Sequence, residues 1–178
     1  MIRHCSPTLA GLKTGSLFTC RVSTQQELRD GVRAWNRRLS GKGVRMLPLR
    51  YAGCRALIYL YRPARLKRDL GDGEACRLLE SRGYTSLHPE RCIVQLIQRL
   101  REEGDFPHEI GLFLGYPPED VMGFMENKAG QCKCAGCWKV YGDPCKAEKI
   151  FAQYKKCTAV YYAQWSNGKS VERLTVAV

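Results

Sequence analysis

The chain has 178 residues, of which 44% are hydrophobic, and a formal net charge of +12 at pH 7. A chain of this length buries roughly 70% of its unfolded surface, which predicts a single domain over residues 1–178. The longest apolar run, Ala56–Tyr61, is far shorter than the roughly 20 residues of a membrane-spanning helix, so the composition excludes such a span.

The N-terminal segment MIRHCSPTLAGLKTGSLF has no continuous apolar stretch, because Ser, Pro, Gly and Lys interrupt it. A secretory signal is therefore not expected, and the sequence predicts a cytoplasmic protein. In that compartment the ten cysteines are expected to be reduced thiols, metal ligands or small buried hydrophobes rather than disulfides.

Cys5 is a candidate nucleophile, since it lies two residues before Pro7, at which a helix is expected to begin. The partial positive charge of a helix N-terminus lowers the pKa of a nearby thiol. Further along the chain, His108 and Glu109 are candidates for a base and the group that orients it. These residues predict a cysteine-dependent enzyme; the alternative is that Cys5 packs near the N-terminus and His108 seals a helix start.

A strand over Ser16–Val22 and a helix opened by a capping box, Thr24 with Glu27, are expected next. Hydrophobic residues then recur at helical spacing, which predicts one buried face. The residues on this face are Leu28, Val32, Trp35 and Leu39. Two β-rich runs around Ala52-Gly53, Val44–Tyr51 and Arg55–Arg62, predict a hairpin. Pro48 lacks an amide donor, so its strand is expected to be at an edge or bulged.

The positive charge is concentrated in the first part of the chain. Residues 1–105 carry 20 basic and 10 acidic side chains, a net of +10, whereas residues 106–178 carry 9 and 7, a net of +2. Arginine predominates in the first part, and its planar guanidinium binds carboxylates and phosphates bidentately. An anionic ligand, RNA or DNA is therefore a candidate partner; the alternative is a solvated basic surface. The candidate anion-binding residues are Arg45, Arg50, Arg55, Arg62 and Arg65.

Three helices are expected after the hairpin, starting at Pro63, at Glu74 and at Pro89. The segment FPHEIGLFLGYPPEDVMGF, Phe106–Phe124, then predicts a short αα-hairpin over residues 107–127. Its spacing is similar to that of a DNA-binding helix-turn-helix. However, residues 106–127 contain four acidic residues and no Lys or Arg, so DNA recognition by this pair is not expected.

Four cysteines, Cys132, Cys134, Cys137 and Cys145, lie close together in the sequence and form a candidate metal site. Four thiolates can bind zinc or an iron–sulfur cluster. The spacing differs from that of paired Cys-x2-Cys zinc modules, since only Cys134 and Cys137 form such a knuckle. Redox or regulatory thiols, or cysteines without a metal, are the alternatives.

The C-terminal part is expected to contain a strand over Trp138–Tyr141, a helix capped by Asp143-Pro144, and a hairpin with its turn at Asn167-Gly168. The strands of this hairpin would be Thr158–Trp165 and Ser170–Ala177. With these elements, the sequence predicts an α+β fold: a mainly antiparallel sheet of about six strands with helices packed against it.

Several segments together carry a family resemblance: CSPTLAGLKTGSLF, ALIYLYRP, FPHEIGLFLGYPPEDVMGF, GCWKVYGD and YKKCTAVY. They resemble the clostridial domain-of-unknown-function family 3793 over nearly the whole chain. The resemblance implies a small cytosolic protein of anaerobic Gram-positive bacteria and gives no role to any residue. The residues themselves favour an accessory or binding protein, linked to thiol or metal chemistry through the loop Cys132–Cys145.

Overall fold

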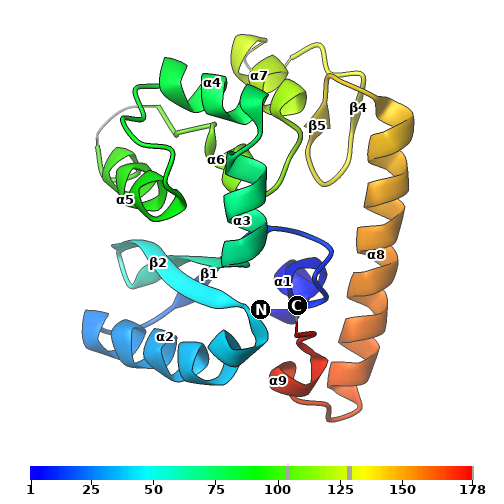
Figure 1. The fold of residues 1–178 in the computed structure, drawn as a ribbon. Helices are drawn as coiled ribbons and strands as arrows, with labels where there is room; N and C mark the ends of the chain where they lie inside the picture. Colours follow the sequence, from blue (N-terminus) through cyan, green and yellow to red (C-terminus); the bar gives the residue numbers. More distant parts are fainter. Residues whose placement is uncertain (103–104, 128–129, 178) are drawn as a thin grey trace. The chain divides into compact units, whose positions relative to one another are not determined.

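The computed structural model describes residues 1–102, 105–127 and 130–177, and its ribbon is drawn in Figure 1. The chain forms two compact units. Unit 1 consists of Met1–Arg65 and Lys156–Val178, and unit 2 consists of Leu66–Lys155. Two helices carry the chain from one unit into the other, α3 (Pro63–Leu70) and α8 (Pro144–Ser166). The single domain over 1–178 stays a prediction.

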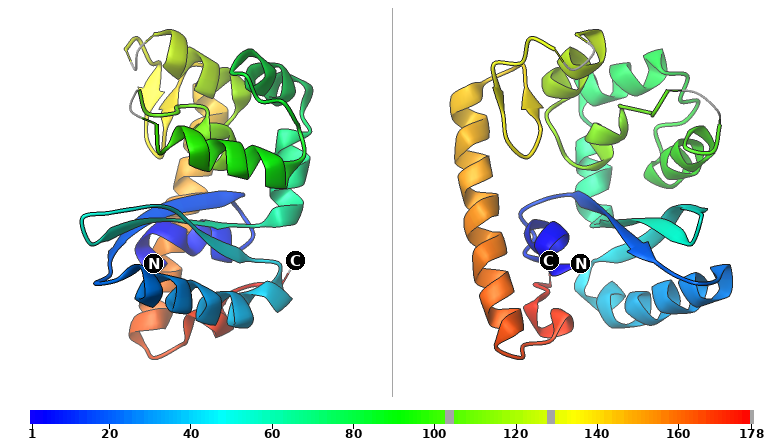
Figure 2. Two further views of the ribbon diagram at one scale, coloured as in Figure 1. Left: turned by 90° about the vertical axis from the view of Figure 1, so that its left-hand side faces the viewer. Right: turned by 180° about the vertical axis from the view of Figure 1, so that it is seen from behind.

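Unit 1 contains a three-stranded antiparallel sheet in the order β1-β3-β2 (Figure 2). The strands are β1 (Gly15–Arg21), β2 (Arg45–Ala52) and β3 (Arg55–Tyr61). The hairpin between β2 and β3 is confirmed, and both of its turn residues, Gly53 and Cys54, have positive φ, as the tight turns of hairpins require. The edge position of Pro48 is also confirmed, and the register shifts between Pro48 and Arg50.

The core of unit 1 lies between this sheet and three helices: α1 (Ile2–Leu9), α2 (Gln25–Leu39) and α9 (Val171–Leu174). The 3-10 turn η1 (Ser40–Lys42) follows α2. The backbone N–H of Glu27 donates to Oγ1 of Thr24 at 3.1 Å, which confirms the expected cap. Alternate residues of β3 face the core because side chains alternate along a strand. The buried core residues are Ile2, Cys5, Leu9, Leu28, Leu39, Val44, Met46, Ala56, Ile58, Leu60 and Leu174.

Unit 2 contains short helices and one small antiparallel ribbon. Asp72 caps the first of them, since its Oδ1 accepts from the backbone N–H groups of Glu74 and Ala75. In the ribbon, Cys134 lies opposite Val140. The elements are α4 (Gly73–Ser81), α5 (Pro89–Arg99), α6 (Ile110–Phe113), α7 (Pro118–Glu126), β4 (Cys134–Ala135) and β5 (Lys139–Val140), followed by the first part of α8.

The expected helix pair at 107–127 is present as α6 and α7, although α6 begins at Ile110 rather than at Pro107. Gly115, with φ 75°, lies in the turn between them. Two glycines allow close packing at this hairpin. A Cβ on Gly111 would lie 2.7 Å from the side chain of Val121, and a Cβ on Gly123 would lie 2.4 Å from that of Tyr141.

The predicted sheet of about six strands is wrong, since the described residues form one sheet of three strands and one of two. The C-terminal hairpin does not form, because α8 continues to Ser166. Gly168, with φ 86°, ends the helix instead of forming a hairpin turn. The backbone N–H of Gly168 donates to the carbonyl of Trp165, and the backbone N–H of Lys169 donates to the carbonyl of Gln164. These two bonds form a Schellman cap. Within the described ranges, no helix is both long enough and apolar enough to cross a membrane.

Candidate functional site

A pocket of about 400 Å³ lies in unit 2, between the α6–α7 hairpin and the β4–β5 ribbon. Its lining is mainly apolar, and the polar side chains at the pocket are those of His108, Tyr116, Asp120 and Lys139. A concave, mostly apolar site with a few polar groups is the usual form of a small-molecule site. The apolar and aromatic lining includes Ile110, Leu114, Val121, Phe124, Ala135 and Trp138.

Aromatic rings form one wall of this pocket. The ring of Tyr116 stacks on that of Trp138 with centroids 4.9 Å apart, and Phe151 contacts Trp138 edge-on at 4.5 Å. The hydroxyl of Tyr116 donates to the carbonyl of Cys137 at 3.3 Å. Burial, together with the nearby Cys137 thiol, raises the pKa of Tyr116 to about 12. The Tyr116 side chain therefore remains a neutral hydroxyl at physiological pH.

Asp120 holds the pocket together and is 3% exposed. Its Oδ2 accepts from Nε1 of Trp138 at 2.7 Å. Its Oδ1 accepts from the backbone N–H groups of Tyr141 and Gly142, each at 2.7 Å. A buried carboxylate is stable only when its oxygens are hydrogen-bonded. Three donors meet this need, so we assign Asp120 the role of positioning Trp138 and the chain after β5.

The structure places His108 at the pocket and Glu109 away from it. The exposed imidazole of His108 contacts the rings of Phe124, at 4.9 Å, and Phe106, at 5.8 Å. Glu109 is 2% exposed, and its Oε1 lies 2.8 Å from Nε of Arg99.

The same oxygen of Glu109 accepts from the hydroxyl of Tyr84 at 3.2 Å. Burial, followed by the effect of Glu109, raises the pKa of Tyr84 above its ordinary value. Because the Glu109 carboxylate binds Arg99 and Tyr84, its observed contacts are those of a structural ion pair in unit 2.

Cys5 lies inside a helix rather than at its start. The expectation that this helix begins at Pro7 is wrong, because α1 begins at Ile2 and Pro7 lies within it. The Cys5 thiol is fully buried in the core of unit 1. Burial raises its pKa from 9.0 to about 12, against smaller lowering effects of nearby positive charges. This is the opposite of the activation expected from a helix N-terminus. Cys5 belongs to unit 1 and His108 to unit 2.

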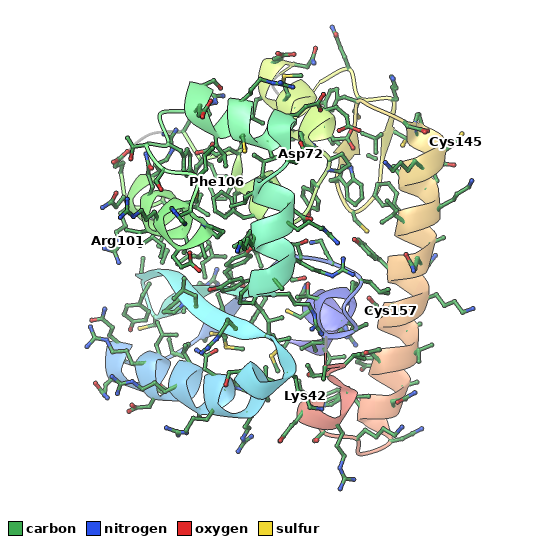
Figure 3. All side chains as sticks on the ribbon, viewed as in Figure 1. Lys42, Asp72, Arg101, Phe106, Cys145 and Cys157 are labelled. Atoms are coloured by element: carbon green, nitrogen blue, oxygen red, sulfur yellow. The ribbon has the colours of Figure 1, made fainter. Side chains whose placement is uncertain are left out.

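The four clustered cysteines lie just before the ribbon (Cys132), in the ribbon and its turn, and at the start of α8. Cys134 is in β4, Cys137 is exposed before β5, and Cys145 is exposed in the first turn of α8 (Figure 3). Desolvation raises the pKa of Cys134, followed by the charges of Glu148 and Cys132. In the part of the chain that the structure describes, no group of three or more His, Cys, Asp or Glu side chains could hold a metal ion. All ten cysteines are described, and none is joined in a disulfide.

The candidate anion-binding arginines differ in exposure. Arg45, Arg50 and Arg55 are exposed on the hairpin. Nη1 of Arg65 approaches the carbonyl of Leu12 at 3.5 Å. Arg62 is buried, at 2% exposure, and its guanidinium donates to four backbone carbonyls at 2.7–3.2 Å. These acceptors belong to Thr8, Leu9, Lys42 and Val176.

The sequence alone did not identify Tyr116, Asp120 and Trp138 as residues of a pocket. A usable signal was nevertheless present: each of the segments FPHEIGLFLGYPPEDVMGF and GCWKVYGD contains glycines beside aromatic residues. The structure explains them, since a Cβ on Gly136 would lie 2.3 Å from the ring of Phe151. Glycines that aromatic side chains cover closely are expected where two segments pack together.

Comparison with known proteins supports the domain-of-unknown-function family that the sequence resembles. No curated protein and no solved structure matches the chain. One family model does match, and it covers residues 1–175, almost the entire chain. The chain therefore belongs to the family described as "Protein of unknown function (DUF3793)".

Proposed function

We propose that this protein is a binding protein that takes a small, mainly apolar ligand into the pocket of unit 2. The observation that carries the proposal is the pocket itself, whose volume of about 400 Å³ lies within the range of small-molecule sites. Its lining comes from two segments that Asp120 joins through Trp138, so the proposed site is held in shape before a ligand arrives.

The chemistry of the lining favours a flat, ring-containing ligand. Ile110, Leu114 and Val121 supply apolar contacts, and the stacked pair Tyr116–Trp138 supplies aromatic faces. Aromatic groups prefer offset-stacked or edge-to-face contacts with such rings. The imidazole of His108 is the group proposed to meet a polar edge of the ligand, since it is exposed and lies at the pocket.

The proposal can be tested with Nile red, a neutral aromatic dye whose fluorescence rises in apolar surroundings. The wild-type protein is expected to bind one dye molecule saturably. Ala135→Leu should weaken this binding at least about ten-fold, because its added methyl groups would occupy part of the pocket. Ala152→Leu is the matched control, since Ala152 is exposed on α8 outside the pocket lining. Equal binding by the two variants would refute the pocket as the site.

The thiol link is part of the same proposal. Ala135 and Gly136 line the pocket and lie between Cys134 and Cys137 in the sequence. A ligand in the pocket is therefore expected to slow the alkylation of Cys137 and to leave that of exposed Cys54, in unit 1, unchanged. Metal analysis of anaerobically purified protein tests the alternative: zinc or iron in stoichiometric amount would favour a metal-binding loop instead.

We further propose a cytoplasmic setting in an anaerobic Gram-positive bacterium, as the family resemblance of the sequence implies. Support comes from the thiols, since ten cysteines without a disulfide suit a reducing compartment. Purification under air and under argon should then give different counts of titratable thiols. Identical counts, with all ten thiols retained in air, would remove this support.

A further inference from the structure

The two units of the chain differ strongly in net charge. Unit 1 carries 16 Lys and Arg against 3 Asp and Glu, a net of +13. Unit 2 carries 13 basic and 14 acidic side chains, a net of −1. The net positive charge of the protein therefore belongs to unit 1, where three carboxylates cannot neutralise sixteen cations. A field of this sign attracts polyanions.

Helix α2 displays much of this charge, with arginines exposed along its length. One of them, Arg38, lies with its Cζ 5.6 Å from the ring centroid of Trp35. Guanidinium groups beside aromatic rings are favourable pairs that present both a charge and a flat apolar face. The exposed arginines of α2 are Arg29, Arg33, Arg37 and Arg38.

A hollow of about 610 Å³ lies in unit 1 next to this helix and exposes further aromatic rings. It is lined by Trp35, by Tyr162 and Trp165 from the C-terminal part of α8, and by Arg3 of α1. The rings of Tyr162 and Trp165 lie 5.8 Å apart, and Trp165 is 46% exposed. A tryptophan with nearly half of its surface in water costs hydrophobic free energy unless a partner covers it.

An arginine lies directly over one of these rings, that of Tyr162. The guanidinium of Arg3 lies 4.7 Å from the ring centroid of Tyr162, and its Nη2 donates to the Tyr162 hydroxyl at 3.0 Å. This hydrogen bond, together with the charge of Arg3, lowers the pKa of Tyr162. The hollow therefore combines cations with ring faces at contact distance.

We propose that this hollow and the adjoining face of α2 bind single-stranded nucleic acid. A base would stack on Trp165, while Arg3, which lies over Tyr162, and Arg38 would meet the phosphates. A single strand is favoured over a duplex because bases must be unstacked to reach the rings. A nucleic acid is favoured over an anionic membrane because the rings line a hollow instead of projecting as an apolar tip. This surface lies in unit 1 and is independent of the pocket of unit 2.

Fluorescence anisotropy with a labelled oligothymidylate of about 20 nucleotides tests the proposal, with salt varied from about 50 to 200 mM. Trp165→Ala should weaken binding about ten-fold at every salt concentration and leave the salt dependence unchanged, because a base–ring contact carries no charge. Trp165→Phe should restore most of the affinity. Circular dichroism and melting temperature establish that both variants fold, as the exposure of Trp165 leads us to expect.

Arg38→Gln should weaken binding and reduce the slope of log K against log salt by about 0.7, the value for one phosphate contact on a single strand. Arg101→Gln is the matched control, since Arg101 is an exposed arginine of unit 2 (Figure 3). Four results would each overturn the proposal: unchanged binding by Trp165→Ala, equal losses for Arg38→Gln and Arg101→Gln, equal competition by a duplex, or binding to phosphatidylserine vesicles without binding to the oligonucleotide.

Discussion

The carboxylate of Asp120 replaces water for three donors that would otherwise be unsatisfied, the indole of Trp138 and two backbone N–H groups. Asp120→Asn keeps the shape of the side chain but removes its charge and turns one acceptor into a donor. We expect the free energy of unfolding to fall by about 2 kcal/mol. Urea unfolding measures this change. Glu126→Gln, at an exposed position of the same helix, should be neutral, and equal losses in both variants would contradict the assignment.

The Cys5 thiol makes a second prediction at the residue scale, which concerns alkaline pH. Its pKa is about 12 in the folded protein and 9.0 ordinarily. Below pH 9 the thiol is protonated in both states, so its ionisation does not change the stability. Above pH 9 it ionises only in the unfolded state, so unfolding becomes easier by up to about 1.4 kcal/mol per pH unit. Cys5→Ala should lack this contribution.

The measurement compares the urea stability of wild type and Cys5→Ala between pH 8 and about pH 10. The wild type should be the more stable at pH 8, since the variant leaves a small cavity, and this advantage should shrink as the pH rises. A constant difference would show that the thiol ionises freely in the fold. Alkylation at neutral pH gives an independent check, because Cys5 should react only after unfolding, long after Cys54 and Cys145.

At the scale of elements, two helical glycines show where a helix tolerates an added side chain and where it does not. Gly31 in α2 and Gly123 in α7 are both helical, but a Cβ on Gly31 meets nothing within 4 Å, whereas one on Gly123 would lie 2.4 Å from Tyr141. Gly31→Ala should raise the free energy of unfolding by about 0.5–1 kcal/mol through helix propensity. Gly123→Ala should lower it by about 1–3 kcal/mol through overpacking. Thermal melts that shift in the same direction for both would disprove the close approach.

The elements that the sequence predicted well are those with strong local signals. The cap at Thr24, the hairpin turn beside Gly53 and the edge position of Pro48 each rest on chemistry within a few residues. The prediction of a C-terminal hairpin was wrong because it relied on the residues that favour strands in Thr158–Trp165. The segment is helical instead, since the spacing of Ala147 and Tyr154 continues to Tyr161. Tyr161 packs against the core of unit 1.

The candidate site was predictable only in part for a related reason. His108 was identified from its chemical type, and it does lie at the pocket. The bonds that build the pocket join Asp120 to residues 18 to 22 positions later, and no local pattern specifies such pairs. Likewise, Arg62 looked like a surface cation because it ends an exposed, arginine-rich hairpin, yet its burial depends on carbonyls as distant as that of Val176.

At the scale of the whole molecule, Arg62 links the two stretches of chain that make up unit 1. Its guanidinium reaches α1, η1 and the segment after α9 through four carbonyls. Lys42, which is labelled in Figure 3, adds donations to the carbonyls of Glu172 and Thr175. Burial lowers the pKa of Arg62, as expected of a cation that dipoles rather than a carboxylate stabilise.

Arg62→Lys should therefore be costly although it conserves the charge, because one ammonium group cannot reach four separated carbonyls. We expect a loss of about 3 kcal/mol in the free energy of unfolding, together with faster proteolysis after residue 170. Arg55→Lys, at an exposed position of the same hairpin, is the control and should change neither quantity. Unchanged stability of Arg62→Lys would show that the four bonds contribute nothing net.

Unit 1 consists of two separate stretches of chain, so all of unit 2 is synthesised before the second stretch of unit 1. Residues 66–155 leave the ribosome before Lys156, so every residue of unit 2 is available while unit 1 still lacks α9 and the carbonyl of Val176. Until then the core face of its sheet has no Leu174 to cover it, and contacts between such distant residues form slowly. The nascent chain should thus depend most on chaperones until residues 156–177 have been synthesised, because the core of its most basic part is open until then.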